Sequence, residues 1–273
     1  MSTQSNWRRR PLIVSFPDGG KATEVYGFAG NSGRVNLEGQ LMAGETPSDT
    51  VFLFMHPTST LQLLPMPMAL ADAGLHVLCA ASRYARNDAA LIMEKVAIDL
   101  GQWVRHARDV LGYAKVVLVG AVPPLMLKTA DNPNGTPLEV FDGIREGTAL
   151  NRSQFFQDLT VPFYGFNRDG VAEVQGLRDS FWLQGMAGSI KGQYDSIREF
   201  SEVDYTADLK AIRRPTLIVH GSDDQIVPIE ASAHRAAEIV QGAELKIYEG
   251  SGHGLAQLQA AQFNTDVLDF IRA

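Results

Sequence analysis

The chain has very little cysteine and no long apolar run. Cys79 is its single cysteine, so no disulfide framework can form within the chain. The longest continuous apolar stretch, Val116 to Leu127, contains two prolines and is too short to cross a bilayer. We therefore expect a cytoplasmic protein without a membrane partner.

Positive charge is also scarce. The formal net charge of −7 disfavours a nucleic-acid partner. The only basic run is Arg8-Arg9-Arg10, which we interpret as a solvated tail. The sequence has no metal-ligand spacing, phosphate loop or dinucleotide-binding signature. We therefore predict neither a bound metal nor a cofactor.

What the chain does contain is an alternation of strand and helix patterns. Val35 to Leu41 alternate between apolar and polar residues, as in a half-buried strand. Residues 51–55 form a continuous apolar run, as expected of a strand covered on both faces. The other expected strands are 75–80, 115–120, 215–220 and 244–248, and the expected helices are 66–74, a long one from Asn87-Asp88, 230–240 and about 255–272. This alternation predicts an α/β protein with a mostly parallel sheet and flanking helices.

The middle of the sequence interrupts the alternation. Residues 137–210 show short helical patterns and no convincing strand; Leu138, Phe141 and Ile144, for example, share one helical face. A helical block inserted into such a sheet predicts a cap over the active site. We therefore expect a core of residues 1–123 and 211–273 with a cap of residues 124–210, all in a single folding unit.

Two polar residues follow the last two expected strands. Asp224 comes after strand 215–220, and His253 lies between glycines after strand 244–248. Ligands of open parallel sheets bind beyond the carboxyl ends of the strands, where a carboxylate can hold an imidazole in one tautomer. Each residue alone also fits a structural role, because Ser222-Asp223-Asp224 is good turn composition. Together they have the acid-then-histidine order of the α/β-hydrolase machinery.

The nucleophile of that machinery is missing. No serine in the chain has glycine two residues before and two residues after it, as a G-x-S-x-G turn requires. With Gly120 as the first glycine of the turn, Val122 falls at the serine and Pro124 at the second glycine. Valine cannot attack a carbonyl. The loop after strand 51–55 still offers the backbone N–H of Thr58 as half of an oxyanion hole.

Several segments resemble the cofactor-free, non-haem chloroperoxidases. They are Ala-Val-Pro-Pro-Leu-Met-Leu-Lys-Thr at 121–129, Phe-Tyr-Gly-Phe-Asn-Arg at 163–168, Leu-Arg-Asp-Ser-Phe-Trp-Leu-Gln-Gly-Met at 177–186, and the block 220–255. The resemblance spans about 118–273. It implies an α/β-hydrolase fold with a helical cap, a Ser-His-Asp triad, esterase activity and perhydrolysis of small carboxylic acids. It also implies that Asp224 is the acid and His253 the base.

The first 117 residues resemble another α/β-hydrolase branch. His56-Pro57, for instance, stands where the chloroperoxidases have His-Gly. Strand 115–120 is the one that should lead into the nucleophile turn. It is followed directly by segment 121–129, which resembles the start of the chloroperoxidase cap. One strand–turn–helix unit of roughly 25–45 residues is therefore expected to be absent.

Three functions follow from these patterns. The first is a hydrolase of small esters or carboxylic acids with a substitute nucleophile such as Ser59. The second is an enzyme in which Asp224 and His253 act as a general-base pair, since proton abstraction needs no serine. The third is a non-catalytic relative, either a binding module or a chimera. Homo-oligomerisation is compatible with all three.

Overall fold

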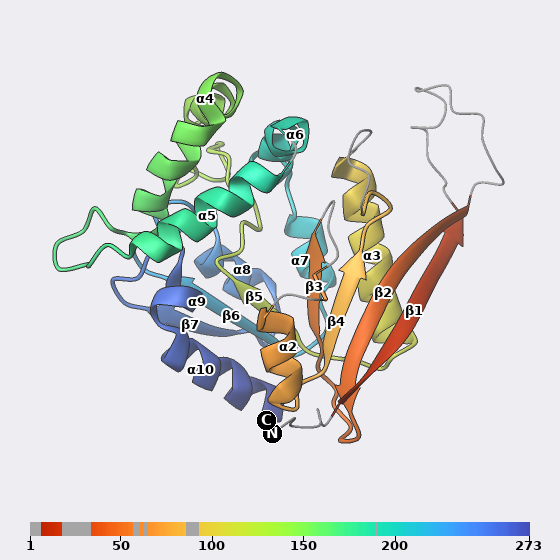
Figure 1. Cartoon of the computed structure of the whole chain (residues 1–273). Helices are drawn as coiled ribbons and strands as arrows, with labels where there is room; N and C mark the ends of the chain where they lie inside the picture. Colours follow the sequence, from red (N-terminus) through yellow and green to blue (C-terminus); the bar gives the residue numbers. More distant parts are fainter. Residues whose placement is uncertain (1–6, 18–33, 57–60, 63–64, 86–92, 189) are drawn as a thin grey trace. The chain divides into compact units, whose positions relative to one another are not determined.

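The computed structural model of the protein describes residues 7–17, 34–56, 61–62, 65–85, 93–188 and 190–273 (Figure 1). Its backbone falls into two compact units, an N-terminal unit of residues 1–114 and a C-terminal unit of residues 115–273. The predicted oxyanion donor Thr58 and the candidate nucleophile Ser59 lie outside the described residues. The predicted division into core and cap stays a prediction.

The N-terminal unit contains a four-stranded sheet in the order β1-β2-β4-β3. Strand β1 (Trp7–Pro17) pairs antiparallel with β2 (Arg34–Gly44), and β2 pairs antiparallel with β4 (Val77–Ala81). Strand β3 (Phe52–His56) is parallel to β4. The three strands expected in this part of the sequence are confirmed.

Strand β1 shows that the interpretation of Arg8-Arg9-Arg10 as a tail is wrong. All three arginines belong to β1, and Arg10 is paired with Leu41 of β2. Their side chains are exposed, whereas Val14 and Phe16 further along the strand are buried. Basic residues and proline are common on edge strands, where they block further pairing. Because three consecutive residues are arginine, this part of the strand lacks the alternation of apolar and polar residues by which a strand is recognised in a sequence.

Helix α3 (Met93–Asp109) packs on this sheet through Trp103. The indole is fully buried and its Nε1 donates to the carbonyl of Ala81 at 2.9 Å. A Cβ at Gly39 would lie only 2.5 Å from the Trp103 ring, so β2 needs glycine where the helix crosses it. The short helix α2 (Pro65–Asp72) precedes β4, as expected from the sequence.

The C-terminal unit contains a three-stranded, wholly parallel sheet (Figure 1). Its order is β5 (Val116–Val119), β6 (Thr216–Gly221) and β7 (Glu244–Tyr248). Every residue of the central strand β6 is buried. The sequence therefore identified all three strands and their direction correctly.

Helices fill the rest of this unit. Between β5 and β6 lie α4 (Leu138–Tyr164), α5 (Gln175–Ala187), α6 (Ile190–Ser201) and α7 (Thr206–Ala211). After β6 come α8 (Ala233–Ile239), α9 (Leu255–Leu258) and α10 (Ala260–Arg272). The helical character expected for 137–210 is confirmed. None of the helices in the described part of the chain is long and apolar enough to cross a membrane.

Candidate active site

The two candidate catalytic residues come from neighbouring parallel strands. Because β6 and β7 run in the same direction, the loops that follow them leave the sheet at one edge. Backbone hydrogen bonds join the loops, from Ser222 N–H to the Tyr248 carbonyl (3.0 Å) and from Asp223 N–H to the Ser251 carbonyl (3.1 Å). A Cβ at Gly221 would lie 2.1 Å from the Ser251 oxygen, so the approach requires glycine.

Asp224 and His253 form a hydrogen-bonded pair. The Nδ1 of His253 lies 2.8 Å from Oδ2 of Asp224. The aspartate side chain is fully buried, whereas 20% of the histidine side chain is exposed. A carboxylate can only accept, so Nδ1 carries the proton and donates it. This leaves Nε2 with a free lone pair, which is the arrangement that a general base needs.

The surroundings of Asp224 keep its carboxylate charged. Burial by itself raises the pKa of Asp224, but hydrogen bonds from His220 and His253 and the charge of His253 outweigh it and hold the pKa well below its usual range. The other oxygen, Oδ1, accepts from the backbone N–H groups of Ile226 (2.9 Å) and Val227 (2.8 Å). An ionised carboxylate beside Nδ1 stabilises the imidazolium that forms when Nε2 takes a proton.

Gly120, at the carboxyl end of β5, faces the imidazole of His253. Its φ is +51°, in the left-handed region that favours glycine. A Cβ built on Gly120 would lie 3.1 Å from Cε1, 3.3 Å from Nδ1 and 3.8 Å from Nε2 of His253. Val122, two residues after Gly120, packs against the apolar cluster around Met126. The residue beside the base therefore has no side chain.

The end of α4 contacts the loop that carries His253. The Phe163 ring meets the His253 ring edge to face, with 4.7 Å between their centroids. The Phe163 carbonyl also accepts from Gly254 N–H at 2.9 Å. Helix α4 ends here because Gly165 takes a left-handed conformation, with φ +72°. Phe163 begins the segment 163–168 that resembles the chloroperoxidases, but the sequence assigns it no role. Only the tertiary structure shows that it contacts His253.

The remaining histidines have other surroundings. His220, near the end of β6, makes a hydrogen bond to the Val227 carbonyl. His76 is buried, and its two ring nitrogens contact the Tyr113 hydroxyl and the Thr46 carbonyl. His234 pairs with Glu230 at the surface. Among the described residues, no three His, Cys, Asp or Glu side chains are grouped closely enough to hold a metal ion.

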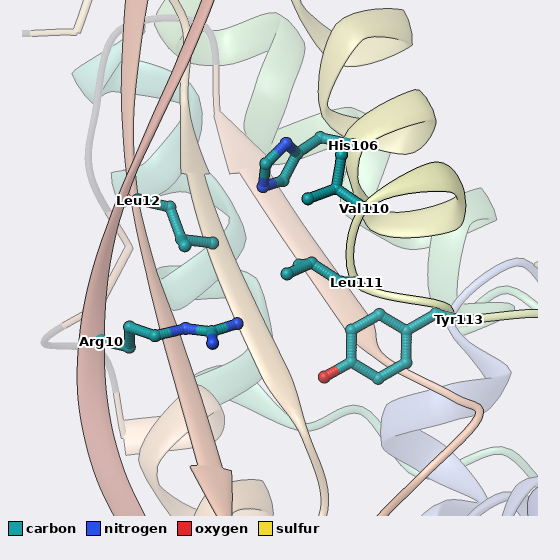
Figure 2. A pocket seen from close by; sticks show the side chains of 6 residues that line it. All are labelled: Arg10, Leu12, His106, Val110, Leu111 and Tyr113. Carbon is teal, nitrogen blue, oxygen red and sulfur yellow. The ribbon is translucent and has the colours of Figure 1, made fainter.

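A hollow of about 420 Å³ lies in the N-terminal unit, between β1 and the end of α3 (Figure 2). It is lined by Arg10, Leu12, His106, Val110, Leu111 and Tyr113. Burial lowers the pKa of His106, and the charge of Arg10 lowers it further. Arg10 points inward from the edge strand, which is a common protection against edge-to-edge pairing. We therefore interpret the hollow as the space that accommodates the Arg10 side chain of this edge strand, and not as a ligand site.

Comparison with known proteins agrees with the fold. The sequence pattern of the α/β hydrolase fold matches residues 113–257, more than half of the chain. The chain belongs to the α/β-hydrolase family. The matched range includes Gly120, Asp224 and His253, so the whole described dyad lies in the part of the chain that carries the α/β-hydrolase pattern.

Within the α/β hydrolases, the chain is homologous to non-haem haloperoxidases and esterases. It is 54% identical over 161 residues to a non-heme haloperoxidase of Rhodococcus erythropolis, covering 59% of each protein. It is 48% identical over 161 residues to a bifunctional esterase/perhydrolase of Acinetobacter calcoaceticus, covering 59% of this chain and 58% of that protein. The chain thus spans about three fifths of the length of the curated relatives it matches.

A solved structure extends the fold comparison along most of the chain. A bromoperoxidase from Bacillus anthracis matches with a TM-score of 0.66 at 24% identity, over 88% of this chain and 97% of that one. At this identity the match shows the fold alone. The α/β-hydrolase fold expected from the sequence is confirmed.

Proposed function

We propose that the chain hydrolyses small esters and that the pair of Asp224 and His253 activates water directly, without a covalent nucleophile. The supporting observation is the 2.8 Å contact between Nδ1 of His253 and Asp224, combined with the bare backbone of Gly120 next to the same imidazole. The contact orients the base. Glycine at position 120 keeps a side chain from crowding the ring, since even a Cβ there would lie 3.1 Å from Cε1 of His253.

The chemistry balances with water as the only co-reactant. Nε2 of His253 takes a proton from water while the water oxygen forms a bond to the ester carbonyl carbon. The carbonyl π electrons move to oxygen and give a tetrahedral oxyanion. When the carbon–oxygen bond to the alcohol breaks, the leaving oxygen takes the proton from Nε2, so the carboxylic acid and the alcohol are released and the base is regenerated. Hydrogen peroxide in place of water gives a peracid by the same steps.

The substrate is expected to be small and partly apolar. Phe163 and Gly120 both contact the imidazole, so a carbonyl carbon in reach of Nε2 lies next to an aromatic ring and a bare backbone. The relative from Acinetobacter calcoaceticus is named an esterase/perhydrolase, which supports the same substrate class. The backbone N–H of Thr58 remains our proposed donor to the oxyanion. A fixed N–H at that place would stabilise the charge that develops on the carbonyl oxygen.

The decisive experiment compares His253→Ala with His234→Ala in hydrolysis of p-nitrophenyl acetate. His234 is a half-exposed histidine of the same unit and bonds Glu230 instead of Asp224. We expect His253→Ala to lower kcat/KM by roughly 100-fold, the usual scale of general-base catalysis, and His234→Ala to leave it unchanged. No burst of p-nitrophenol should precede the steady state, and a fluorophosphonate probe should label no serine.

Two results would contradict this proposal in different ways. Stoichiometric labelling of a serine would show a covalent nucleophile, such as Ser59, and would replace the water mechanism. A folded protein with a cooperative melt and no hydrolysis above buffer would show a non-catalytic member of the family.

A further inference from the structure

His220 is a buried titratable residue for which the proposed chemistry has no direct use. It is the penultimate residue of β6 and follows the apolar run Leu217-Ile218-Val219. Its side chain is 0% exposed. Burying an imidazole in a strand is costly unless its polar atoms find partners, so its contacts indicate why the residue is there.

One nitrogen of His220 makes both of its polar contacts. Nε2 lies 2.9 Å from the carbonyl oxygen of Val227 and 3.2 Å from Oδ2 of Asp224. Both partners can only accept, so the ring proton is on Nε2 and is shared between them. The opposite nitrogen, Nδ1, is buried and has no hydrogen-bond partner among the described residues. The ring is thus oriented by its Nε2 side alone.

The two histidines meet on the same carboxylate oxygen. Oδ2 of Asp224 accepts from Nδ1 of His253 at 2.8 Å and from Nε2 of His220 at 3.2 Å. Oδ1 is held by the backbone N–H groups of the following turn. A carboxylate rotates easily about its last torsion, which has broad minima. The bond from His220 opposes that rotation at the oxygen that faces the base.

We infer that His220 is a positioning residue for the acid–base pair: its Nε2–H fixes Oδ2 of Asp224 in the direction that His253 requires. This role rests on the proposed function, because orientation of His253 matters only where its Nε2 acts as a base. In a purely structural role, the hydrogen bond to the Val227 carbonyl alone would account for a histidine at this position. The bond to Asp224 makes the prediction specific.

The chain allows a matched pair of variants. In His220→Gln the side-chain amide nitrogen stands close to the former Nε2 and can donate to the same acceptors. In His220→Asn the amide nitrogen stands where the unpartnered Nδ1 was and falls short of Asp224. Both variants carry the same amide group in a buried position. A difference between them therefore reports the position of the donor and not the loss of an aromatic ring.

The experiment measures the hydrogen bond and the turnover separately. The Nδ1–H proton between His253 and Asp224 should give a low-field proton NMR signal, assigned by its loss in His253→Ala. We expect His220→Asn to shift or broaden this signal and to lower kcat roughly tenfold with KM unchanged, the scale of a slightly misoriented catalytic group. His220→Gln should keep the signal and keep kcat within about twofold.

A measurement on the unmodified protein covers the case in which a variant does not fold. Long-range proton–nitrogen correlations of 15N-histidine-labelled protein report which ring nitrogen of His220 carries the proton, and we expect Nε2. A proton on Nδ1 would overturn the inference, as would an unchanged signal and kcat in a folded His220→Asn. Equal impairment of His220→Gln would overturn it as well. If the unmodified protein lacks esterase activity, the proposed function fails, while the tautomer and the low-field signal still decide the positioning role.

Discussion

The two units of the chain use the same residue types in different ways. In the N-terminal unit both ring nitrogens of the buried His76 are occupied, and the Asp99 carboxylate is fully bonded to Arg83. In the C-terminal unit Asp224 bonds Nδ1 of His253, and among the described residues no hydrogen bond is made by Nε2. The first sheet is largely antiparallel, whereas the second is wholly parallel and sends two loops out at one edge. The parallel order of β6 and β7 thus brings Asp224 and His253 together in two loops beyond the sheet, where the imidazole is partly exposed, whereas His76 is buried.

The largest expected effect comes from Asp224→Asn. The amide oxygen can keep the bonds from Ile226 and Val227, but the amide NH₂ then faces the N–H groups of both histidines. We expect kcat to fall by roughly 100-fold or more and the free energy of unfolding to fall by about 3 kcal/mol at pH 7. Ester hydrolysis and urea titration measure the two losses. Unchanged turnover in the folded variant would remove Asp224 from the mechanism.

The pH dependence of that stability loss has a definite sign. Because folding lowers the pKa of Asp224, its carboxylate stabilises the folded state fully above the unfolded pKa of about 3.9. The stabilisation is lost as pH falls below that value through the folded pKa. The difference in unfolding free energy between the parent and Asp224→Asn should therefore be constant above about pH 5 and shrink below about pH 4. A difference that grew with acidification would contradict the assignment.

The matching change in the N-terminal unit is Asp99→Asn. Asp99 has no exposed side-chain surface and holds the Arg83 guanidinium at 2.7 Å and its backbone N–H at 2.8 Å. Removing the charge leaves Arg83 poorly paired, and we expect a loss of about 3 kcal/mol in unfolding free energy. The initial rate per folded molecule should stay the same. A large fall in that rate would show that the buried pair of this unit contributes to chemistry after all.

A smaller effect is expected from Gly120→Ala, with Gly242→Ala as its control. Both glycines have a positive φ, +51° and +75°, so each alanine should cost about 1 kcal/mol in stability. Only the methyl group at position 120 meets the His253 ring; nothing lies within 4 Å at position 242. We expect kcat to fall roughly tenfold in Gly120→Ala and to be unchanged in Gly242→Ala. Equal rates in the two variants would mean that position 120 is not next to the reacting groups.

The smallest effect is expected from a partly exposed ion pair. Lys246 contacts Asp266 at 2.7 Å, and the hydrogen bond to Asp266 raises the pKa of Lys246. Because the lysine is partly exposed, Lys246→Met should cost only about 0.5 kcal/mol, and the cost should fall in high salt. Thermal melts at low and high salt measure it. A cost as large as that of Asp99→Asn would contradict the claim that burial sets the difference between the two pairs.

Local sequence patterns were sufficient to predict a strand wherever its burial produces a recognisable pattern of apolar residues. Strands β5, β6 and β7 were predicted from continuous apolar runs, because parallel strands are covered on both faces. Asp224 and His253 were found because each follows such a strand. The missed strand β1 has the opposite character: its residues from Arg8 to Pro11 are exposed and three of them are charged, so only pairing with β2 makes them a strand.

The candidate site was predicted less completely than the fold. Counting from Gly120 put Val122 at the serine position of the turn, and nothing in that count indicated that Gly120 itself lies next to His253. The closeness of Gly120 to the imidazole depends on the pairing of β5 with β6 and on the backbone at Gly120, whose φ is +51°. His220 contacts both the Val227 carbonyl and Asp224, and these contacts depend on how the turn 224–227 folds back toward β6.

The sequence by itself determined the α/β class, the candidate acid and base, and the absence of a G-x-S-x-G turn, because each depends on residue type and local order. Tertiary structure decided which groups meet: Asp224 Oδ2 lies near two imidazoles, and both the Phe163 ring and the backbone of Gly120 lie close to the His253 ring. These contacts join residues up to 133 positions apart, from Gly120 to His253. Distances across such separations are set by strand pairing and loop closure, which no local pattern encodes.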